Sequence, residues 1–177
     1  MSMPAHTRRF SPRLGFSIVE LMVVLAIASI ITTMAIPSFQ DTIDRQKLSA
    51  ASSDLYASVA MTRNEAIRRG GRVELTAINN NWNNGWEVNV LNGGRRERIY
   101  RHGPVPNGIG IAQTGLGNNL SYDGTGRTTT PRNSQAVVTG RWVINVNRAG
   151  SPHRRFLRIN TVGRPLLCNP AANTTCT

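Results

Sequence analysis

GFSIVELMVVLAIASIITTMAIPSF, residues 15–39, is the stretch of sequence that decides the fold. As a helix, its apolar residues 16–39 would be roughly 36 Å long, enough to cross a bilayer core of about 30 Å. Glu20 is the one charged residue in this stretch. Because a carboxylate costs about 2.5–3.5 kcal/mol at mid-membrane and less near an edge, Glu20 predicts a partner for this side chain.

Three other interpretations of this stretch stay open at this point. A secretory signal peptide would also have a basic start, here Arg8, Arg9 and Arg13, but its apolar region is usually shorter, roughly 7–15 residues. A plain membrane anchor fits the length and leaves Glu20 unexplained. A buried core helix would tolerate Glu20 only if it were paired.

The remaining length and charge predict where the parts of the chain lie. With 177 residues, the chain has room for one soluble domain beyond the anchor. The basic leader predicts a cytoplasmic N-terminus, so the domain would face the periplasm or the exterior.

A second helical segment follows the apolar one, over residues 40–69. Apolar and small residues recur there at helical spacing and predict one stripe packed on a globular domain. They are Leu48, Ala51, Leu55, Val59, Thr62 and Ala66. Asp41, Asp44, Arg45 and Lys47 are expected to face water. Gly70-Gly71 predicts the end of the helix, and Pro37 predicts a kink near the membrane exit.

Beyond Gly71 the sequence alternates β-like runs with Gly, Asn and Pro, which predicts strands. We expect them at Arg72–Ile78, Trp86–Leu91, Arg98–Arg101, Ile109–Gln113, Ala136–Val146 and Arg154–Asn160, with a long loop at Thr114–Ser134. Trp86 and Trp142 are expected in the core or an interface. The predicted fold class is α+β, a long N-terminal helical spine packed against a small antiparallel β-sheet.

The N-terminal stretch resembles the prepilin signature of type IV pilins and type II secretion pseudopilins. Gly15, Phe16, Glu20 and Pro37 occupy the places of the family's glycine, phenylalanine, fifth mature residue and helix-interrupting proline. The resemblance implies that a prepilin peptidase cleaves between Gly15 and Phe16 and methylates the new amine. It also implies that Glu20 pairs with the Phe16 amine of a neighbouring subunit during assembly.

Further segments resemble the GspH/FimT group of minor pilins. They are the helix segments 50–55 and 62–69, the run VEL at 73–75 that follows, the segment LSYDGTGR at 120–127, and the tail VGRPLLC at 162–168. The resemblance implies a minor component at the tip or in the priming complex of a filament. The domains expected are a cleaved leader (1–15), a transmembrane assembly helix (16–39), an amphipathic helix (40–70) and a β-rich periplasmic or extracellular domain (71–177).

Cys168 and Cys176 lie close together at the end of the chain. In an oxidising compartment this spacing predicts one disulfide that closes a short terminal loop. Metal binding is the alternative, but no further ligand stands nearby in the sequence and the three histidines are scattered. We expect no metal and no cofactor.

The cationic residues are the other informative feature, because the chain has a formal net charge of +12 and no acidic residue after Asp123. A surface of one sign attracts polyanions, and arginine binds phosphate and stacks on bases. The candidate DNA-binding residues are Arg154, Arg155, Arg158 and Arg164. Some FimT-type members bind DNA, and their tail pattern is Gly-Arg-x-Arg. In this chain Leu166 stands in place of the second arginine. The alternative is a basic surface that serves solubility or pairs with acidic neighbours in a filament.

The sequence offers no catalytic constellation: we find no paired carboxylates, Ser-His-Asp or Cys-His set, or phosphate loop. The expected function is a minor type IV pilin subunit of the priming or tip complex, held in the inner membrane before it joins other minor and major pilins. A minor pseudopilin of a type II secretion system is the alternative within the class. A membrane-anchored DNA receptor that never enters a filament is the alternative from another class.

Overall fold

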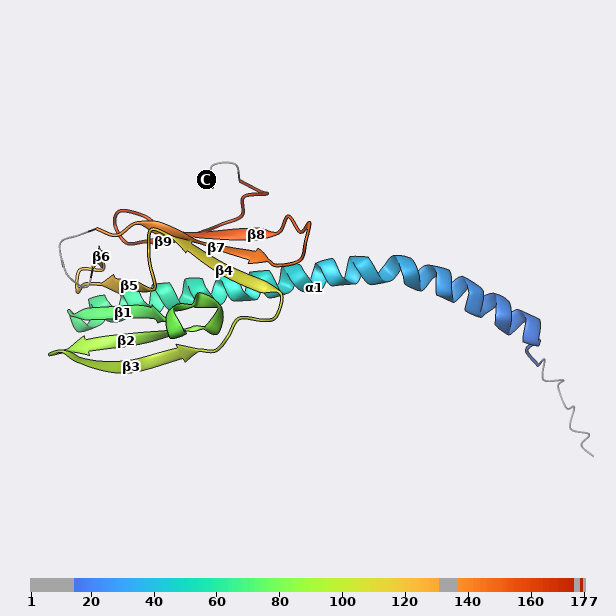
Figure 1. Cartoon of the computed structure of the whole chain (residues 1–177), viewed down its shortest axis with the longest axis horizontal. Helices are drawn as coiled ribbons and strands as arrows, with labels where there is room; N and C mark the ends of the chain where they lie inside the picture. The colour runs from blue at the N-terminus through green and yellow to red at the C-terminus, as the bar shows by residue number, and fades with distance from the viewer. Residues whose placement is uncertain (1–14, 131–136, 174–175, 177) are drawn as a thin grey trace, which may run out of the picture. The chain divides into compact units, whose positions relative to one another are not determined.

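The computed structural model describes residues 15–130, 137–173 and 176, and it describes the backbone but not the side chains of residues 34–38. The chain forms two compact units that divide between Gln40 and Asp41. Helix α1 (Ile18–Arg69) belongs to both units, and all the strands belong to the second (Figure 1). The strands are β1 (Arg72–Ala77), β2 (Trp86–Asn92), β3 (Arg95–His102), β4 (Ile109–Thr114), β5 (Asn119–Tyr122), β6 (Thr128–Thr129), β7 (Gly140–Val146), β8 (Arg154–Ile159) and β9 (Pro165–Cys168), with the short 3-10 helices η1 (Ile78–Asn80) and η2 (Trp82–Asn84) between β1 and β2.

Helix α1 ends where the sequence supplies two glycines. The amide of Gly70 donates to the carbonyl of Ile67 at 3.2 Å, and the amide of Gly71 donates to that of Ala66 at 3.1 Å. Gly70 has a φ of +58°, a left-handed conformation that glycine adopts without steric cost. The structure does not describe the side chains of residues 34–38, where the sequence predicts a kink at Pro37.

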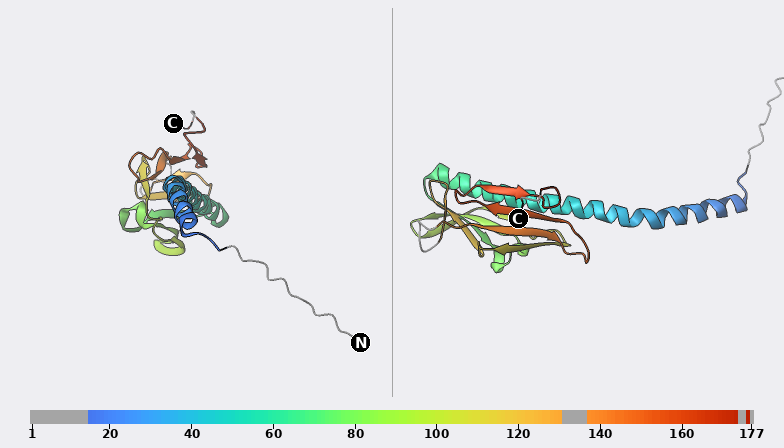
Figure 2. Two further views of the ribbon diagram at one scale, coloured as in Figure 1. Left: turned by 90° about the vertical axis from the view of Figure 1, so that its right-hand side faces the viewer. Right: turned by 90° about the horizontal axis from the view of Figure 1, so that it is seen from above.

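Within the second unit, α1 buries the stripe that its sequence predicts. Leu48, Ala51, Leu55, Val59, Thr62 and Ala66 are each at most 1% exposed. The hydroxyl of Thr62 donates to the carbonyl of Ser58 at 2.6 Å, which lets a polar side chain lie in the core. The strands lie along this part of the helix, as the view from above in Figure 2 shows.

The strands form two antiparallel sheets. Sheet A has the order β3-β2-β1-β5-β6, and sheet B has the order β4-β7-β8-β9. One face of each sheet packs into a core shared with α1, with Val73 and Leu75 from sheet A and Trp142 and Ile144 from sheet B. The α+β class is confirmed, but the single small sheet of the prediction is in fact two sheets.

Three strands lie where the sequence analysis placed a loop or no element. Thr114–Ser134 contains β5 and β6, because Leu120 and Tyr122 pair with Leu75 and Val73 of β1 and are buried. The third is β9, a short edge strand that begins with a proline, which can start such a strand without a ladder donor. The expected strand Ala136–Val146 is shorter, as β7, and Ala136 lies outside the described residues.

Tryptophans form the centre of the core. Trp86 and Trp142 are fully buried, as predicted, and Trp82 is 3% exposed. The rings of Trp82 and Trp142 meet edge to face with centroids 5.2 Å apart. The indole N–H of Trp86 donates to the hydroxyl of Ser58 on α1 at 2.8 Å, which fixes sheet A on the helix.

Candidate functional site

The first unit presents an apolar helix that begins at a capped end. The hydroxyl of Ser17 accepts a hydrogen bond from the amide of Val19 at 3.3 Å, and its carbonyl accepts one from the amide of Leu21 at 3.1 Å. Serine is a preferred N-cap because its oxygen satisfies an otherwise unpaired amide. The sequence analysis missed this cap, although a serine directly before an apolar helix is its usual signal.

The side chains of this helix are exposed on every side. Apolar residues from Phe16 (78%) through Leu25 (60%) to Ile31 (61%) are more than half exposed within the chain. A helix that is apolar all round is typical of one that is covered by lipid or by other helices. Among the described residues, no helix has the length and apolar character needed to cross a membrane.

The polar side chains of the same helix differ in how they are satisfied. The hydroxyls of Ser29, Thr32 and Thr33 donate to carbonyls one turn back at 2.7–3.0 Å. Glu20 is exposed and has no hydrogen-bond or ion-pair partner among the residues that the structure describes. Unlike these hydroxyls, the carboxylate of Glu20 is not satisfied by a described residue of the chain.

In the second unit, three of the segments that carry the GspH/FimT resemblance meet at one place: 62–69, 120–127 and 162–168. Arg63 of α1 donates through Nε to the carbonyl of Gly126 at 2.9 Å. The hydroxyl of Tyr122 donates to the carbonyl of Gly163 in the tail at 2.9 Å, and burial raises the pKa of this tyrosine. Helix, middle segment and tail are thus tied together by two buried or partly buried hydrogen bonds.

Glycines make this close approach possible. A Cβ on Gly163, which has a φ of +79°, would lie 2.6 Å from the carbonyl oxygen of Gly126. A Cβ on Gly124 would lie 2.4 Å from the backbone of Gly70 at the end of α1. The loop 123–127, which contains Gly124 and Gly126, is held by Asp123. The carboxylate of Asp123 accepts hydrogen bonds from Thr125 and from the amide of Arg127. Burial alone would raise the pKa of Asp123, but these hydrogen bonds hold it below the usual value.

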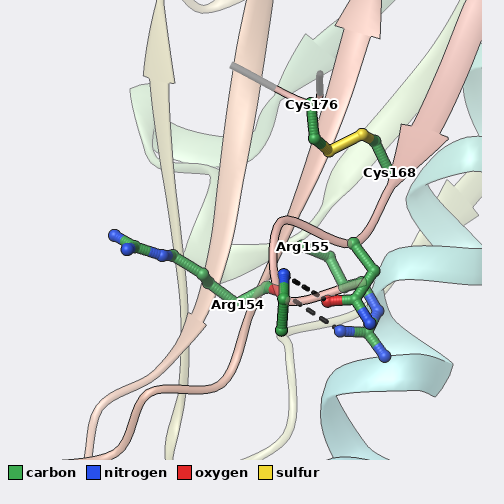
Figure 3. The surroundings of a disulfide bond; sticks show 6 residues. Arg154, Arg155, Cys168 and Cys176 are labelled. Atoms are coloured by element: carbon green, nitrogen blue, oxygen red, sulfur yellow. Dashed lines mark hydrogen bonds between the residues drawn. A yellow bond between two sulfur atoms is a disulfide. The ribbon is translucent and has the colours of Figure 1, made fainter. Parts of the chain in front are cut away.

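The candidate DNA-binding arginines do not all lie on one surface. Arg154 and Arg158 alternate along β8 with the buried Leu157 and Ile159, so they lie on the outer face of sheet B, away from the core. Arg155 extends to the opposite side, toward α1, and Figure 3 shows the two neighbouring arginines pointing apart. Arg164 is exposed in the turn that joins β8 to β9.

The outer face of sheet B combines arginines with an aromatic ring. The guanidinium groups of Arg141 and Arg154 lie 5.1 Å and 5.9 Å from the centroid of Phe156, which is 7% exposed. Arg158 pairs in register with Arg141 on β7 and with Leu166 on β9. Leu166 stands where the Gly-Arg-x-Arg pattern has its second arginine, so that position lies next to Arg158 on the same face. We define Arg141, Arg154 and Arg158 around Phe156 as the arginine face.

Four arginines of sheet A bind carboxylates. Glu74, 2% exposed on β1, binds Arg96 at 2.9 Å and Arg72 at 3.3 Å. Glu87 on β2 binds Arg98 at 2.8 Å and lies 3.6 Å from Arg101. The deeply buried carboxylate of Glu74 is tolerated because it also accepts hydrogen bonds from Ser121 at 3.1 Å and from Asn119 at 3.2 Å. The two sheets therefore differ in the charge that they present.

The acids at the start of the second unit hold the loop between β7 and β8. Asp41 binds Nε2 of His153 at 2.7 Å, and Asp44 binds Arg148 at 2.9 Å. The hydrogen bond from His153 lowers the pKa of Asp41. These contacts make both aspartates partly buried, whereas the sequence analysis expected them to face water; Arg45 is exposed as predicted.

The two cysteines form the predicted disulfide. Cys168 at the end of β9 is bonded to Cys176, with their Cα atoms 5.9 Å apart, and Cys176 is 1% exposed (Figure 3). The turn between them is held by Asn169, whose side chain accepts a hydrogen bond from the amide of Ala171 at 3.2 Å. In the described ranges, no three histidine, cysteine or acidic side chains gather as they would around a metal ion.

Comparison with protein families gives two matches. Residues 51–163 match the family described as "Type II transport protein GspH", which is more than half of the chain. Residues 11–36 match the "Prokaryotic N-terminal methylation motif", and they include Gly15, Phe16 and Glu20.

Individual relatives agree with these matches. The chain is 25% identical over 144 residues to "Fimbrial protein Q" of Moraxella bovis, which covers 78% of this chain and 88% of that protein. The type IV minor pilin FimU of Pseudomonas aeruginosa shares the fold, with a TM-score of 0.61 and 20% identity over 73% of this chain and 92% of that one.

A pseudopilin shares the fold as well. The minor pseudopilin EpsH of the type 2 secretion system of Vibrio cholerae matches with a TM-score of 0.55 and 12% identity, over 70% of this chain and 98% of that one. The resemblance inferred from the sequence is confirmed. The chain belongs to the GspH family and is a minor pilin or pseudopilin of a type IV pilus or a type II secretion system.

Proposed function

We propose that this chain is a minor type IV pilin of the pilus priming or tip complex. A prepilin peptidase removes residues 1–15 by cleavage between Gly15 and Phe16 and methylates the Phe16 amine. Helix residues 16–39 then lie in the inner membrane, and residues 40–70 continue the helix into the β-rich domain, 71–177. The single observation that carries this proposal is an apolar helix, exposed on all sides, in which Glu20 has no partner among the described residues.

The pairing of Glu20 with an amine explains how subunits take a fixed stagger. In an apolar medium an unpaired carboxylate is costly, whereas one opposite a cation and hydrogen-bonded to it is tolerated. The Phe16 amine of a neighbouring subunit is such a cation. Because the hydroxyls of Ser29, Thr32 and Thr33 bind their own helix, they do not compete for this partner.

The proposed location follows from the leader and the disulfide. Arg8, Arg9 and Arg13 keep the N-terminus in the cytoplasm, so the second unit faces the periplasm before it joins the pilus. The Cys168–Cys176 disulfide is typical of an oxidising compartment and supports this orientation.

The decisive experiment replaces Glu20 and measures incorporation into filaments. Glu20→Ala removes the carboxylate, and Ser29→Ala, which removes a self-satisfied hydroxyl from the same helix, is the matched control. Immunoblots of sheared filaments and of inner membranes are compared. We expect Glu20→Ala to be processed and membrane-bound but lost from filaments at least tenfold, with Ser29→Ala unchanged. Equal incorporation of the two variants would contradict the pairing. Absence of the wild type as well as both variants from filaments is the result expected for an anchored receptor outside a filament.

The pseudopilin alternative predicts a different phenotype for the same chain. Deleting its gene would reduce secretion of folded exoproteins and leave surface pili intact. Under our proposal, surface piliation falls and secretion continues. Measuring both in one deletion strain separates the two systems.

A second candidate function, DNA binding for uptake, is favoured by the arginine face. Arg141 and Arg154 lie against Phe156, whereas Glu74 and Glu87 bind four of the arginines of sheet A. Phosphates would bind the guanidinium groups, with an affinity that falls as salt rises. Arg164, in the adjoining turn, would extend the contact; Arg155 points away from it.

A mobility-shift titration of the full chain in non-ionic detergent tests this candidate. Arg154→Gln with Arg158→Gln should weaken binding of a DNA duplex by about tenfold or more. Arg95→Gln, at the exposed start of β3 in sheet A, removes one charge and is the control for each of the single variants Arg154→Gln and Arg158→Gln. A double variant that binds as tightly as the wild type would exclude this face as the DNA site.

A further inference from the structure

A small cationic pocket lies on the other side of β8 from the arginine face. Its volume is about 260 Å³, and it is lined by Arg45 and Leu48 of α1, by Pro152–Arg155, and by Asn169 and Ala171 of the disulfide-closed loop. Figure 3 shows Arg155 on this side, near α1 and below the loop that follows Cys168. The volume is below the roughly 300–1,000 Å³ of sites for drug-sized ligands, so it suits one small group.

The charge in this pocket comes chiefly from Arg155. Its Nη1 donates to the carbonyl of Arg154 at 3.2 Å, and no carboxylate pairs with it among the residues that the structure describes. A guanidinium has five N–H donors, so this one retains donors for a further acceptor while it is already half-buried. Such a group gains most from a planar or tetrahedral oxyanion bound by two parallel hydrogen bonds.

The neighbouring charges leave the pocket positive. Asp41 binds both Arg45, at 2.8 Å, and His153, at 2.7 Å, and so neutralises one positive charge beside the pocket. The guanidinium of Arg154 lies over Phe156 on the far face. Arg45 therefore lines the pocket from α1 and Arg155 lines it from β8. The nearby carboxylate is that of Asp41, which lies between Arg45 and His153.

We propose that this pocket binds a single oxyanion, a carboxylate or a phosphate group, between Arg155 and Arg45. The disulfide contributes by holding the turn at Asn169 and Ala171 as one wall. The group can come from an acidic side chain of another protein or from phosphate in solution. In either case the ligand site differs from the arginine face, which lies on the opposite side of the same strand.

Titration calorimetry of the full chain in non-ionic detergent, without DNA, tests the proposal. Inorganic phosphate and acetate are titrated separately at constant ionic strength, with chloride as the reference anion. We expect phosphate to bind at one site per chain. Binding of acetate as well would identify a general oxyanion site that accepts a side-chain carboxylate, and binding of phosphate alone would identify a phosphate site.

The variants assign the binding to this pocket. Arg155→Gln should weaken it at least about tenfold, since a charge-assisted hydrogen-bonded pair is lost, and Arg45→Gln should weaken it by a smaller factor. Arg95→Gln removes the same charge from sheet A and should bind as the wild type does. Cys168→Ser with Cys176→Ser should weaken binding about threefold because the wall must then be ordered on binding.

Several results would overturn the proposal. They are an absence of binding by either anion, an affinity of Arg155→Gln equal to that of the wild type, or a loss in Arg95→Gln as large as that in Arg155→Gln. If Arg155→Gln fails to fold, Arg45→Gln decides, because its side chain is 64% exposed and its removal leaves the core intact. An unchanged affinity in that variant would refute the two-arginine site.

Discussion

Gly163 offers a quantitative test of how the tail is joined to the rest of the second unit. In Gly163→Ala, the new methyl group would lie 2.6 Å from the carbonyl oxygen of Gly126 and 3.1 Å from the ring of Tyr122. The carbonyl of Gly126 cannot move away without disturbing its hydrogen bond from Arg63 at 2.9 Å. The substitution therefore perturbs the helix, the middle segment and the tail together.

The expected loss of stability has two parts. An alanine at a φ of +79° costs roughly 1–2 kcal/mol of backbone strain. Weakening a hydrogen bond to a charged donor costs a further 1.5–3 kcal/mol, roughly. Together these parts predict that Gly163→Ala lowers the free energy of unfolding by about 2.5–5 kcal/mol.

Gly150→Ala separates these two parts. Gly150 has nearly the same φ, +77°, but its Cβ would meet nothing within 4 Å, so only the strain of about 1–2 kcal/mol is expected. Urea unfolding is followed by tryptophan fluorescence, which reports on the second unit because all three tryptophans of the chain lie in its core. If the two variants lost the same free energy within about 0.5 kcal/mol, the close approach at Gly163 would not matter for stability.

Three further predictions concern the same unit. Leu55→Ala, at a fully buried position of α1, should lower the free energy of unfolding by about 2–5 kcal/mol in the same urea assay, whereas the exposed control Tyr56→Ala should change it by less than about 1 kcal/mol. Removing both cysteines should cost about 2–3 kcal/mol through the loop they close, and reduction of the wild type with dithiothreitol should have the same effect. Hydrogen bonds from Arg68 and Arg69 lower the pKa of Glu65 to about 2, so the stability that this carboxylate contributes is present above its unfolded pKa of 4.5 and is lost as the pH falls toward 2. Since Arg68 is largely exposed, we expect this contribution to be at most about 1 kcal/mol. The measurement is the free energy of unfolding over this pH range, which should depend less on pH in Glu65→Gln than in the wild type.

Much of the fold could be predicted because its periodic signals are local. The stripe from Leu48 to Ala66 repeats at helical spacing, and Gly70-Gly71 ends the helix for a reason that needs no tertiary information. Strands such as β1, β2 and β4 were predicted within a residue or two because each is bounded by asparagine, glycine or proline.

The missed strands depend on partners distant in sequence. Asn119–Tyr122 is only four residues long, and it becomes a strand because Leu120 and Tyr122 fill the core beside β1. Likewise, β9 forms on the edge of β8. Neither run has a periodic pattern long enough to identify it alone.

The candidate site shows a similar limit. The prediction grouped Arg154 and Arg155 because they are adjacent in sequence, but neighbours in a strand point to opposite faces. No sequence pattern indicated that Glu74 would be buried between Arg72 and Arg96, because that cluster joins β1 to β3 across the sheet. The disulfide could be predicted because its two cysteines are close in sequence.

The ion pairs of sheet A have a consequence for any polyanion held by the opposite sheet. Only guanidinium groups that neutralise phosphates, and so release the cations condensed on the DNA, contribute to the ionic-strength exponent of binding, at about 0.9 per contact on duplex DNA. With four of its arginines bound to Glu74 and Glu87, sheet A contributes less to that exponent. A ligand on the arginine face would therefore owe the salt dependence of its binding mainly to the few arginines of that face, although the chain carries a formal +12.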